Sequence, residues 1–541
     1  MKKNKTASPR FSEAKEDKTE FFMSLDLRVG IDVGGTNTDA VIMKGSELLA
    51  SVKMNTTKDV TSGVKEALNQ VLSTGKVDKK DLSAVMIGTT HFTNAVVEQT
   101  RLTQTAVIRL ALPSSSAIPP MAQWPEGLVD AIGRHHYEIE GGYNFDGRAI
   151  NPLDESALTD IANELKDKGI RHVVVNCVFG PVNDDMERRA AEILSSVWEE
   201  FDIVCSVDVG RIGFLERENA AILNASLREL SEKTVKAFEH ALNECGVYCP
   251  FYITQNDGTL MSATYVKKFP VLTFASGPTN SMRGAAFLSG LKDAIVVDVG
   301  GTTSDVGLLQ NGFPRQANAH VDICGVRTNF RMPDMVSIGL GGGTRIHQEN
   351  GLISVGPDSV GYRLSKEALV FGGNTLTTSD IAVALGQLEL GDHSAVDDLS
   401  DELLEECSKQ IDELIFDAVE SNRLSKTPIP VLAVGGGSVL VKEQVGDLKV
   451  IRPPHFHVAN AVGAAIAQVS GEVDRVYSLA EISREEAFSQ AEQEATERAI
   501  HAGAMPESIE VVEKEDVPLA YLPGNATRVR LKVVGDLKVG S

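Results

Sequence analysis

Two aspartates, Asp32 and Asp298, open two nearly identical glycine-rich segments that lie about half the chain apart. The first reads DVGGTNTD over residues 32–39, and the second reads DVGGTTSD over residues 298–305. Paired glycines permit positive φ angles and let backbone N–H groups approach an anion closely. A carboxylate beside such a nest can hold hydrated Mg²⁺, which prefers one or two carboxylates together with phosphate oxygens. The two segments therefore predict a site for a phosphate group and its divalent cation.

Glycines and small polar residues follow each aspartate, and these are the predicted phosphate contacts. Threonine and serine hydroxyls add hydrogen-bond donors to the backbone N–H groups. Asp32 and Asp298 receive both a catalytic and a metal-holding assignment. The alternative is a pair of glycine-tightened hairpins whose aspartates only cap turns, but two matched copies favour function. The predicted contacts are Gly34, Gly35, Thr36, Asn37, Thr38, Gly300, Gly301, Thr302, Thr303 and Ser304.

Apolar runs flank both segments and predict the elements that position the aspartates. LRVGI precedes and AVIM follows the first copy, while AIVV precedes and VGLL follows the second. Each copy is therefore typical of a β-hairpin with glycines at its tip. A repeat this far apart is no solenoid, because solenoid periods run to roughly 20–50 residues. We expect two related domains that each contribute one loop to a shared site.

A third glycine element follows late in the chain, at VLAVGGGS over residues 431–438. It is typical of a buried strand that runs into a glycine turn, with a helix beginning at Ser438. This arrangement is the usual platform for the sugar and base of a nucleotide. A further glycine turn, GLGGGT, lies at residues 339–344. The predicted nucleotide contacts in these turns are Gly341, Gly342, Gly435, Gly436, Gly437 and Ser438.

With these elements the chain resembles the actin, Hsp70 and sugar-kinase ATPase superfamily, and within it the hydantoinase A/5-oxoprolinase family. The resemblance covers nearly everything from about residue 27 onward. Long stretches outside the glycine turns carry it as well as the turns themselves. These stretches include IGTTHFTNAVVE at 87–98, GRIGFLERENAAILNA at 210–225, ITQNDGTLMSA at 253–263, TFASGPTNSMRGAAFL at 273–288, VGPDSVGYRL at 355–364, ALVFGGNTLTTSDIAVALG at 368–386 and HVANAVGAAIAQVSGEVDR at 457–475.

The resemblance implies an α/β protein with two related actin/Hsp70-like ATPase domains around an interdomain nucleotide cleft, plus a small C-terminal αβ unit. We place the first domain at residues 27–210, the second at 211–471 and the C-terminal unit at 472–541. Residues 1–26 are polar and charged without periodicity, which predicts a disordered leader.

Between the two DVGGT segments, apolar periodicity predicts alternating strands and helices. This alternation is typical of a mainly parallel sheet. Near residue 453, the PPHFHVANAV stretch has a His-x-His alternation that resembles the end of a strand. The expected helices are 153–168, 184–200 and about 216–244, and the expected buried strands are 171–180 and 203–207.

The activity that the resemblance implies is ATP-dependent opening of a cyclic amide, such as a hydantoin, 5-oxoproline or a lactam. An unstrained amide resists water, and its oxygen is a poor leaving group. Phosphorylation of that oxygen makes it a good leaving group, and water can then attack the activated carbon. ATP and Mg²⁺ are the implied cofactors. The implied partners are the cyclic amide and a separate hydantoinase B-like β subunit, and a homo-oligomer is a further expectation.

Two other functions stay open at this point. A small-molecule kinase or a carboxylase-type subunit of the same superfamily would use the same loops, and a phosphorylated product or bicarbonate dependence would identify it. A nucleotide-switch protein would bind ATP without chemistry, since a fold does not prove a function. The aspartates retained in both loops favour turnover.

Two further sets of residues have candidate roles. Glu216 begins a long predicted helix and could act as a base towards water or substrate, or could simply complement the helix N-terminus. His91, at another helix start, could cap or pack. It could also join His136 and Asp130 around a second metal such as Zn²⁺, because imidazoles and a carboxylate suit that ion. His135 is a further candidate for this set.

Composition narrows the function classes. With 52 basic and 75 acidic residues, the net charge of −23 argues against nonspecific nucleic-acid binding, which needs a basic footprint. No apolar run reaches the ~18 residues of a membrane helix, and no signal-peptide core is visible. The six cysteines lack a CxxC pair, as in reduced proteins, so a cytoplasmic location is expected.

Several well-known enzyme motifs are absent from the sequence, namely GxxxxGK[ST], GxSxG and HExxH, and GLGGGT fails the GxGxxG spacing. These absences exclude P-loop, α/β-hydrolase, zincin and Rossmann interpretations.

Overall fold

Both DVGGT segments form antiparallel β-hairpins, as predicted, in a computed structural model that describes residues 26–55, 60–317, 320–349, 351–425, 427–520 and 523–538. In the first hairpin, β1 (Leu27–Val33) pairs with β2 (Asn37–Lys44), and Asp32 lies opposite Asp39. In the second, β11 (Ala294–Val299) pairs with β12 (Ser304–Gln310), and Asp298 lies opposite Asp305. The two copies therefore share one register. The predicted leader lies outside the described residues, apart from Asp26.

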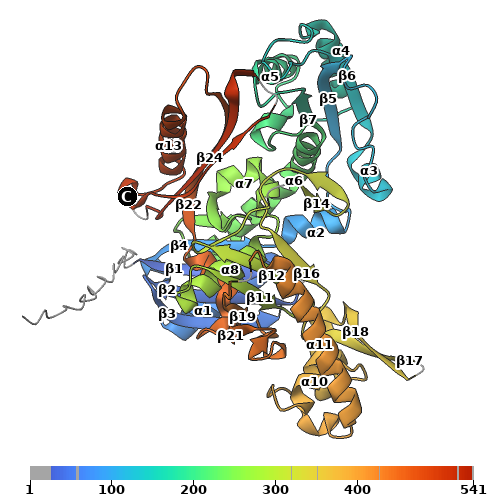
Figure 1. The fold of residues 1–541 in the computed structure, drawn as a ribbon, viewed down its shortest axis with the longest axis vertical. Helices are drawn as coiled ribbons and strands as arrows, with labels where there is room; N and C mark the ends of the chain where they lie inside the picture. The colour runs from blue at the N-terminus through green and yellow to red at the C-terminus, as the bar shows by residue number, and fades with distance from the viewer. Residues whose placement is uncertain are drawn as a thin grey trace, which may run out of the picture.

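Each hairpin belongs to a larger sheet in which a parallel strand lies beside its first strand (Figure 1). β4 (Leu82–Thr89) pairs with β1, and β19 (Val431–Val434) pairs with β11. The first sheet has nine strands in the order β23-β24-β22-β10-β9-β4-β1-β2-β3, and the second runs β13-β12-β11-β19-β21-β20, with β16 beside β12. The other strands are β3 (Glu47–Asn55), β9 (Phe251–Thr254), β10 (Thr259–Ser262), β13 (Phe313–Pro314), β16 (Met335–Ile338), β20 (Gln444–Val445), β21 (Leu448–Ile451), β22 (Gln468–Ser478), β23 (Glu510–Pro518) and β24 (Ala526–Gly535).

Two helices lie against each other between the hairpins. α8 (Ser276–Ser289) contacts β11 and β12, and α12 (Ala459–Ala465) contacts β1 and β2. Glycines permit the close approach, because a Cβ at Gly284 would overlap the carbonyl oxygen of Ala459, and one at Gly463 would overlap that of Asn280. This contact fixes the two hairpins relative to each other and brings polar residues of both helices to the hairpins.

The predicted parallel sheet exists, but it is a separate four-stranded sheet in the order β6-β5-β7-β8, with every pairing parallel. Apolar side chains of α4 and α5 pack on it in one buried cluster. The long helix α6 (Phe214–Glu244) connects it to the rest of the chain. The elements are β5 (Thr105–Leu112), α3 (Glu126–Ile132), β6 (His135–Glu140), α4 (Glu155–Asp167), β7 (His172–Cys177), α5 (Asp185–Val197) and β8 (Asp202–Cys205).

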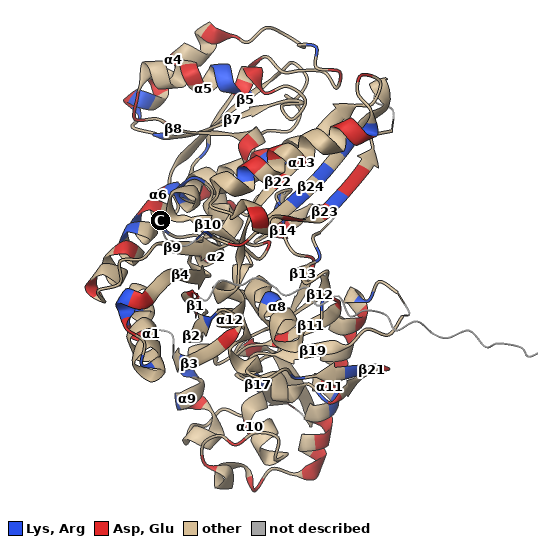
Figure 2. Ribbon diagram, turned by 90° about the vertical axis from the view of Figure 1, so that its left-hand side faces the viewer, with Lys and Arg blue, Asp and Glu red and all other residues tan. Residues whose placement is uncertain are grey.

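The C-terminal segment forms strands and a helix, as predicted for a small αβ unit, and its strands extend the first sheet. β22 pairs in parallel with β10, and β24 and β23 continue the sheet outward. α13 (Arg484–His501) packs on these strands so closely that a Cβ at Gly471 would overlap a backbone oxygen of the helix. Because the first sheet also takes β9 and β10, the sheets do not follow the predicted boundaries at residues 210 and 471. Figure 2 shows charged residues spread along α13 and β22–β24.

Two local predictions are wrong. The turn after β19 leads into a single 3₁₀ turn, Ser438–Leu440, and not into a helix. The HFHVANAV stretch is a 3₁₀ turn, Phe456–Val458, followed by α12, and not the end of a strand.

The remaining elements lie around these units, and none of the helices in the described residues is long and apolar enough to cross a membrane. They are α1 (Val60–Gly75), α2 (His91–Val97), α7 (Ala263–Lys268), β14 (Val321–Ile323), β15 (Val326–Thr328), β17 (Thr344–Glu349), β18 (Leu352–Ser359), α9 (Leu364–Glu367), α10 (Thr378–Ala384) and α11 (Asp401–Asn422).

Candidate functional site

The tips of the two hairpins touch. A Cβ placed on Gly301 would lie 3.0 Å from Cγ2 and 3.1 Å from Oγ1 of Thr36. Equivalent backbone hydrogen bonds close the two tips. Gly34 N–H donates to the backbone oxygen of Asn37 at 3.0 Å, and Gly300 N–H donates to that of Thr303 at 2.9 Å. The structure therefore brings the two predicted phosphate loops together, with matching geometry, from opposite sides of one site.

The other glycine turns pack against the second loop. Gly342 donates its N–H to the Gly300 oxygen at 3.0 Å, and Gly437 donates to the Val299 oxygen at 2.8 Å. Gly435 has a φ of +84°, and a Cβ there would overlap a carboxylate oxygen of Asp298. Any larger residue at that position would displace the aspartate. The two DVGGT loops, the GGGS turn and the GLGGGT turn therefore lie at one place.

Asp32 is buried at the end of β1, with 5% of its surface exposed. Asn280 of α8 donates to Oδ1 at 3.2 Å, and Asn460 of α12 donates to Oδ2 at 3.1 Å. Burial raises the pKa of Asp32 to about 6, although the hydrogen bond from Asn280 acts in the opposite direction. On β4, Gly88 leaves the space for this carboxylate, since a Cβ there would overlap Oδ1.

Asp298 is held by the same helix as Asp32. Burial raises its pKa, and a hydrogen bond from Ser281 opposes that shift. Because Asn280 and Ser281 are consecutive in α8, one helix turn contacts the first aspartate of both hairpins. Sequence analysis did not single out these contacts, although SGPTNS lies within a stretch that carries the family resemblance.

The closing aspartates have different surroundings. Asp39 accepts from Lys53 of β3 at 2.7 Å and from Asn460 at 2.9 Å. Burial raises the pKa of Asp305 to about 6, opposed by a hydrogen bond from Ser337. Lys53 and Asn460 were missed because neither belongs to a glycine-rich motif. The repeat of the closing aspartate in both copies was the available signal that this position matters.

The chemistry of these residues fits a nucleotide and a divalent cation. Ser276 Oγ, Asn280 Oδ1 and Ser438 Oγ are buried without a hydrogen-bond partner, and the first two lie on α8 beside Asp32. Buried polar atoms need partners, so these are atoms that a bound group or its water would satisfy. Among the described residues no group of three His, Cys, Asp or Glu side chains could hold a metal. A cation between Asp32 and Asp298 would therefore complete its shell with phosphate oxygens and water, as Mg²⁺ does.

The structure does not bring together the residues predicted to hold a second metal. Exposed Asp130 accepts from Arg134 at 3.2 Å, and His136 lies on β6 with Nε2 buried and unpartnered. His91 begins α2, where Nε2 lies 3.4 Å from Nη1 of Arg101. The zinc prediction fails because residues 130 and 136 belong to the four-stranded unit, and no such cluster forms in the described part of the chain.

Glu216 lies in the first turn of α6 and forms an ion pair with Arg327 at 3.1 Å. Its predicted role as a base stays a prediction. Glu218, two residues on, is fully buried and accepts from Arg109 at 2.9 and 2.6 Å. Asn176 donates to the same carboxylate at 2.9 Å. Glu218 therefore fixes α6 to the four-stranded sheet and is satisfied there.

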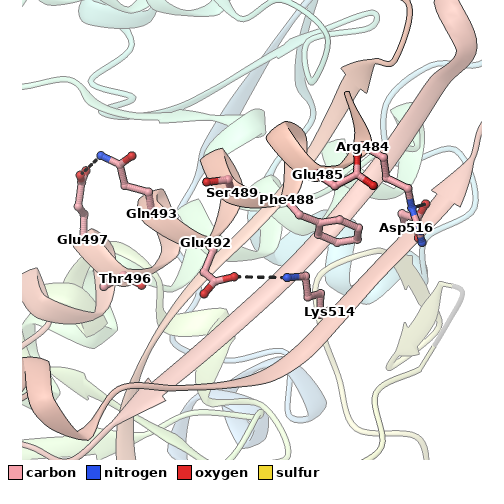
Figure 3. Close-up of a pocket in the computed structure, with 10 residues that line it drawn as sticks. All are labelled: Arg484, Glu485, Phe488, Ser489, Glu492, Gln493, Thr496, Glu497, Lys514 and Asp516. Atoms are coloured by element: carbon pink, nitrogen blue, oxygen red, sulfur yellow. Dashed lines mark hydrogen bonds and ion pairs between the residues drawn. The ribbon is translucent and has the colours of Figure 1, made fainter. Parts of the chain in front are cut away.

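A surface pocket of about 970 Å³ lies between α13 and β23, far along the first sheet from the hairpins (Figure 3). Phe488 lies between two ion pairs that cross it, from Arg484 to Asp516 (2.8 Å) and from Lys514 to Glu492 (3.4 Å). Its lining contains none of the glycine-turn residues.

Comparison with known proteins decides the family. Residues 28–198 match the hydantoinase/oxoprolinase N-terminal region, and residues 217–395 match the hydantoinase/oxoprolinase model. The chain belongs to the hydantoinase/oxoprolinase family. Both DVGGT segments and the GLGGGT turn of this hydantoinase/oxoprolinase family member lie inside the matched regions.

Its relatives have varied activities. An uncharacterised protein of Methanocaldococcus jannaschii is 25% identical over 514 residues, which is 84% of this chain and 74% of that protein. The acetophenone carboxylase gamma subunit of Aromatoleum aromaticum is 27% identical over 66% of this chain and 53% of its own length. The caprolactamase subunit alpha of Pseudomonas jessenii is 24% identical over 67% and 55%. In these alignments the chain spans about half the length of the two named subunits.

Solved structures of the family show the same fold. The ATP-dependent caprolactamase of Pseudomonas jessenii matches with a TM-score of 0.77 at 18% identity, covering 94% of this chain and 88% of that one. Nucleotide-free acetone carboxylase matches with a TM-score of 0.68 at 18% identity, covering 95% and 88%. This family member therefore has the predicted actin-like ATPase arrangement.

Proposed function

We propose that the chain binds ATP and Mg²⁺ between the two hairpins and uses the γ-phosphoryl group to activate the carbonyl of a cyclic amide for ring opening by water. The observation that carries this proposal is the contact of the two matched loops at Thr36 and Gly301, with Asp32 buried and Asp298 half-buried behind them. Relatives named caprolactamase and 5-oxoprolinase support the choice of substrate class.

Each group has a defined task in this proposal. Backbone N–H groups and hydroxyls of the two loops hold the phosphate chain, and Asp32 and Asp298 hold Mg²⁺, which supplies charge neutralisation at the transferring phosphoryl group. Asn280 and Asn460 fix the orientation of the Asp32 carboxylate. The amide oxygen attacks the γ-phosphorus and ADP leaves. Water then adds to the activated carbon and the C–N bond breaks, with the nitrogen taking up a proton, which leaves an acyl phosphate. A second water hydrolyses this acyl phosphate to the ring-opened carboxylate and free phosphate.

A carboxylase-type role is the second candidate. The acetophenone carboxylase gamma subunit and the acetone carboxylase beta subunit of Xanthobacter autotrophicus, 28% identical over 252 residues, favour it. The same loops would then phosphorylate a different oxygen before carboxylation. The names of these relatives as subunits also support a partner subunit, and we propose a hydantoinase B-like β subunit in that role.

ATP hydrolysis by the purified chain with Mg²⁺ tests the proposal, with and without hydantoin, 5-oxoproline and caprolactam, and with acetone plus bicarbonate as the competing substrate. We expect a cyclic amide to stimulate ADP release. Asp298→Ala should lower that rate by roughly a hundredfold or more, because the cation loses a ligand. Asp398→Ala, at an exposed aspartate before α11, is the matched control and should leave the rate unchanged. Stimulation by ketone and bicarbonate alone would establish the carboxylase role, and failure to bind ATP would overturn both.

A further inference from the structure

One lysine reaches the hairpin site from the edge of the first sheet. Lys53 lies on β3, directly opposite Asp39 in the β2–β3 register. Its Nζ donates to both carboxylate oxygens of Asp39 at 2.7 Å and to the backbone oxygen of His457 at 3.2 Å. A Cβ on Gly436 would lie 3.6 Å from Lys53 Cε. The first hairpin, the GGGS turn and the start of α12 therefore meet at this one side chain.

The site at the two hairpins has more negative than positive side chains among the described residues. Asp32, Asp39, Asp298 and Asp305 lie together at the two hairpins, and among the described residues their only ion pair with a cationic side chain is that of Asp39 with Lys53. The positive charge of Lys53 also lowers the pKa of Asp298 in the second hairpin, against the effect of burial. The ammonium group therefore acts on both halves of the site.

His457 is the other titratable group that packs here, on the turn before α12. Burial lowers its pKa, and the nearby Lys53 lowers it further, so it is neutral at physiological pH. An incoming triphosphate adds negative charge to a site that already holds four carboxylates. Lys53 is therefore the described side chain with the charge and position to compensate it.

We propose that Lys53 contacts the phosphate chain of ATP. Asp39 positions its ammonium group in the free protein, and one of its hydrogen bonds passes to a phosphate oxygen when ATP binds. This inference rests on the proposed ATP function of the two hairpins. An ammonium group has three rotatable donors on a flexible stem, so it can give one to a phosphate oxygen while Asp39 keeps another. The Lys53 side chain is 32% exposed, so it is accessible to solvent and to a ligand.

A purely structural role would have different consequences. If Lys53 only neutralised buried Asp39, its loss would loosen the first hairpin and weaken the binding of every nucleoside ligand alike. A phosphate contact instead weakens binding according to the number of phosphates and leaves adenosine unaffected. The comparison of ligands within one variant therefore separates the two roles.

The test measures the affinities of adenosine, AMP, ADP and ATP, with Mg²⁺, for the full chain and three variants. In Lys53→Met we expect ATP and ADP to bind roughly tenfold to a hundredfold more weakly, since a charge-assisted bond is lost, while adenosine binds as before. Lys53→Arg should retain most of the affinity because it keeps the charge. Lys44→Met, at an exposed lysine of the same hairpin, is the matched control.

A second measurement does not depend on how Lys53→Met folds. In the unmodified chain, ATP should protect Lys53 from an amine-reactive reagent, read by mass spectrometry, and adenosine should not. Equal affinity for ATP in Lys53→Met, an equal loss for all four ligands, or no protection by ATP would each overturn this inference and leave the ATP function standing. If the unmodified chain binds adenosine and ATP equally weakly or not at all, the proposed function itself falls.

Discussion

The two DVGGT hairpins have the same register and tip bond but different electrostatic surroundings. In the first, the closing aspartate Asp39 is 2% exposed and is matched by Lys53 and the amide of Asn460. In the second, Asp305 faces Ser337 across the strand pair, and burial raises its pKa to about 6. The two copies therefore share a backbone arrangement, but in the described part of the chain only the first has a cationic side chain paired with its closing aspartate.

The opening aspartates differ less. Two amides, from α8 and α12, bind Asp32, and a serine of α8 binds Asp298. These donors are neutral, so they orient the carboxylates without cancelling their charge. A site built this way leaves Asp32 and Asp298 ready for a cation from solution and places the protein's own cation to one side, at Asp39. The contact between α8 and α12 is what keeps the two halves in this relation.

The largest expected effect comes from forcing the two halves apart. Gly284→Ala places a methyl group where the carbonyl oxygen of Ala459 lies, so α8 and α12 must separate. We expect the free energy of unfolding to fall by about 3 kcal/mol, as for an overpacked core, and ATP affinity to fall with it. Urea unfolding and ATP titration measure both quantities.

Lys292→Ala, at an exposed lysine just after the same helix, is the control for Gly284→Ala and should change stability by less than about 0.5 kcal/mol. If Gly284→Ala matches it in both measurements, the helix contact does not hold the hairpins together. A loss of stability with normal ATP affinity would instead separate the packing role of the contact from the site.

A smaller effect, on the pH dependence of ATP turnover, distinguishes Asp32, which opens the first copy, from Asp305, which closes the second. Asn280→Ala removes a hydrogen bond that lowers the pKa of Asp32, so that pKa should rise above its value of about 6. A cation needs the carboxylate deprotonated, and kcat/KM for ATP should therefore fall at a pH roughly one unit higher than in the unmodified chain. The measurement is the pH profile of ATP turnover between pH 5 and 9.

Ser337→Ala is the counterpart in the second copy, because it removes the hydrogen bond that lowers the pKa of Asp305. We expect its pH profile to match that of the unmodified chain, since Asp305 is not among the proposed cation ligands. An equal shift in both variants would assign the cation to Asp305 as well.

Sequence patterns predicted the parts of this site that are local. The hairpins follow from apolar runs around paired glycines. Lys53, Asn280 and Asn460 could not be found this way, because their role comes from which strand edge or helix meets the hairpins. The residues proposed for zinc have suitable chemistry, but such a cluster does not form among the described residues, and residue types alone do not show this.

For the fold, too, the sequence predicted single elements better than the pairings between distant segments. α12 was missed because a seven-residue helix rich in buried alanine has no polar face and hence no helical period. The C-terminal strands look like a separate pair in the sequence. They join the first sheet through β22, which pairs in parallel with β10 at Thr259–Gln468 and Leu260–Val469. Pairings between residues so distant in the chain leave no periodic signal.

The smallest expected effect compares the two closing aspartates most directly. Replacing each by asparagine should change the free energy of unfolding in opposite directions. An acid whose pKa is higher in the folded than in the unfolded chain costs stability when charged, and this cost disappears as the pH falls from about 6 toward the unfolded value of about 4. Asp305→Asn should therefore raise the free energy of unfolding by about 1 kcal/mol at pH 8, with the gain vanishing near pH 4. Asp39→Asn should lower it by about 1 kcal/mol at pH 8, because the ion pair with Lys53 is lost. Urea unfolding at both pH values gives the signs, and equal signs in the two copies would mean that Lys53 does not set them apart.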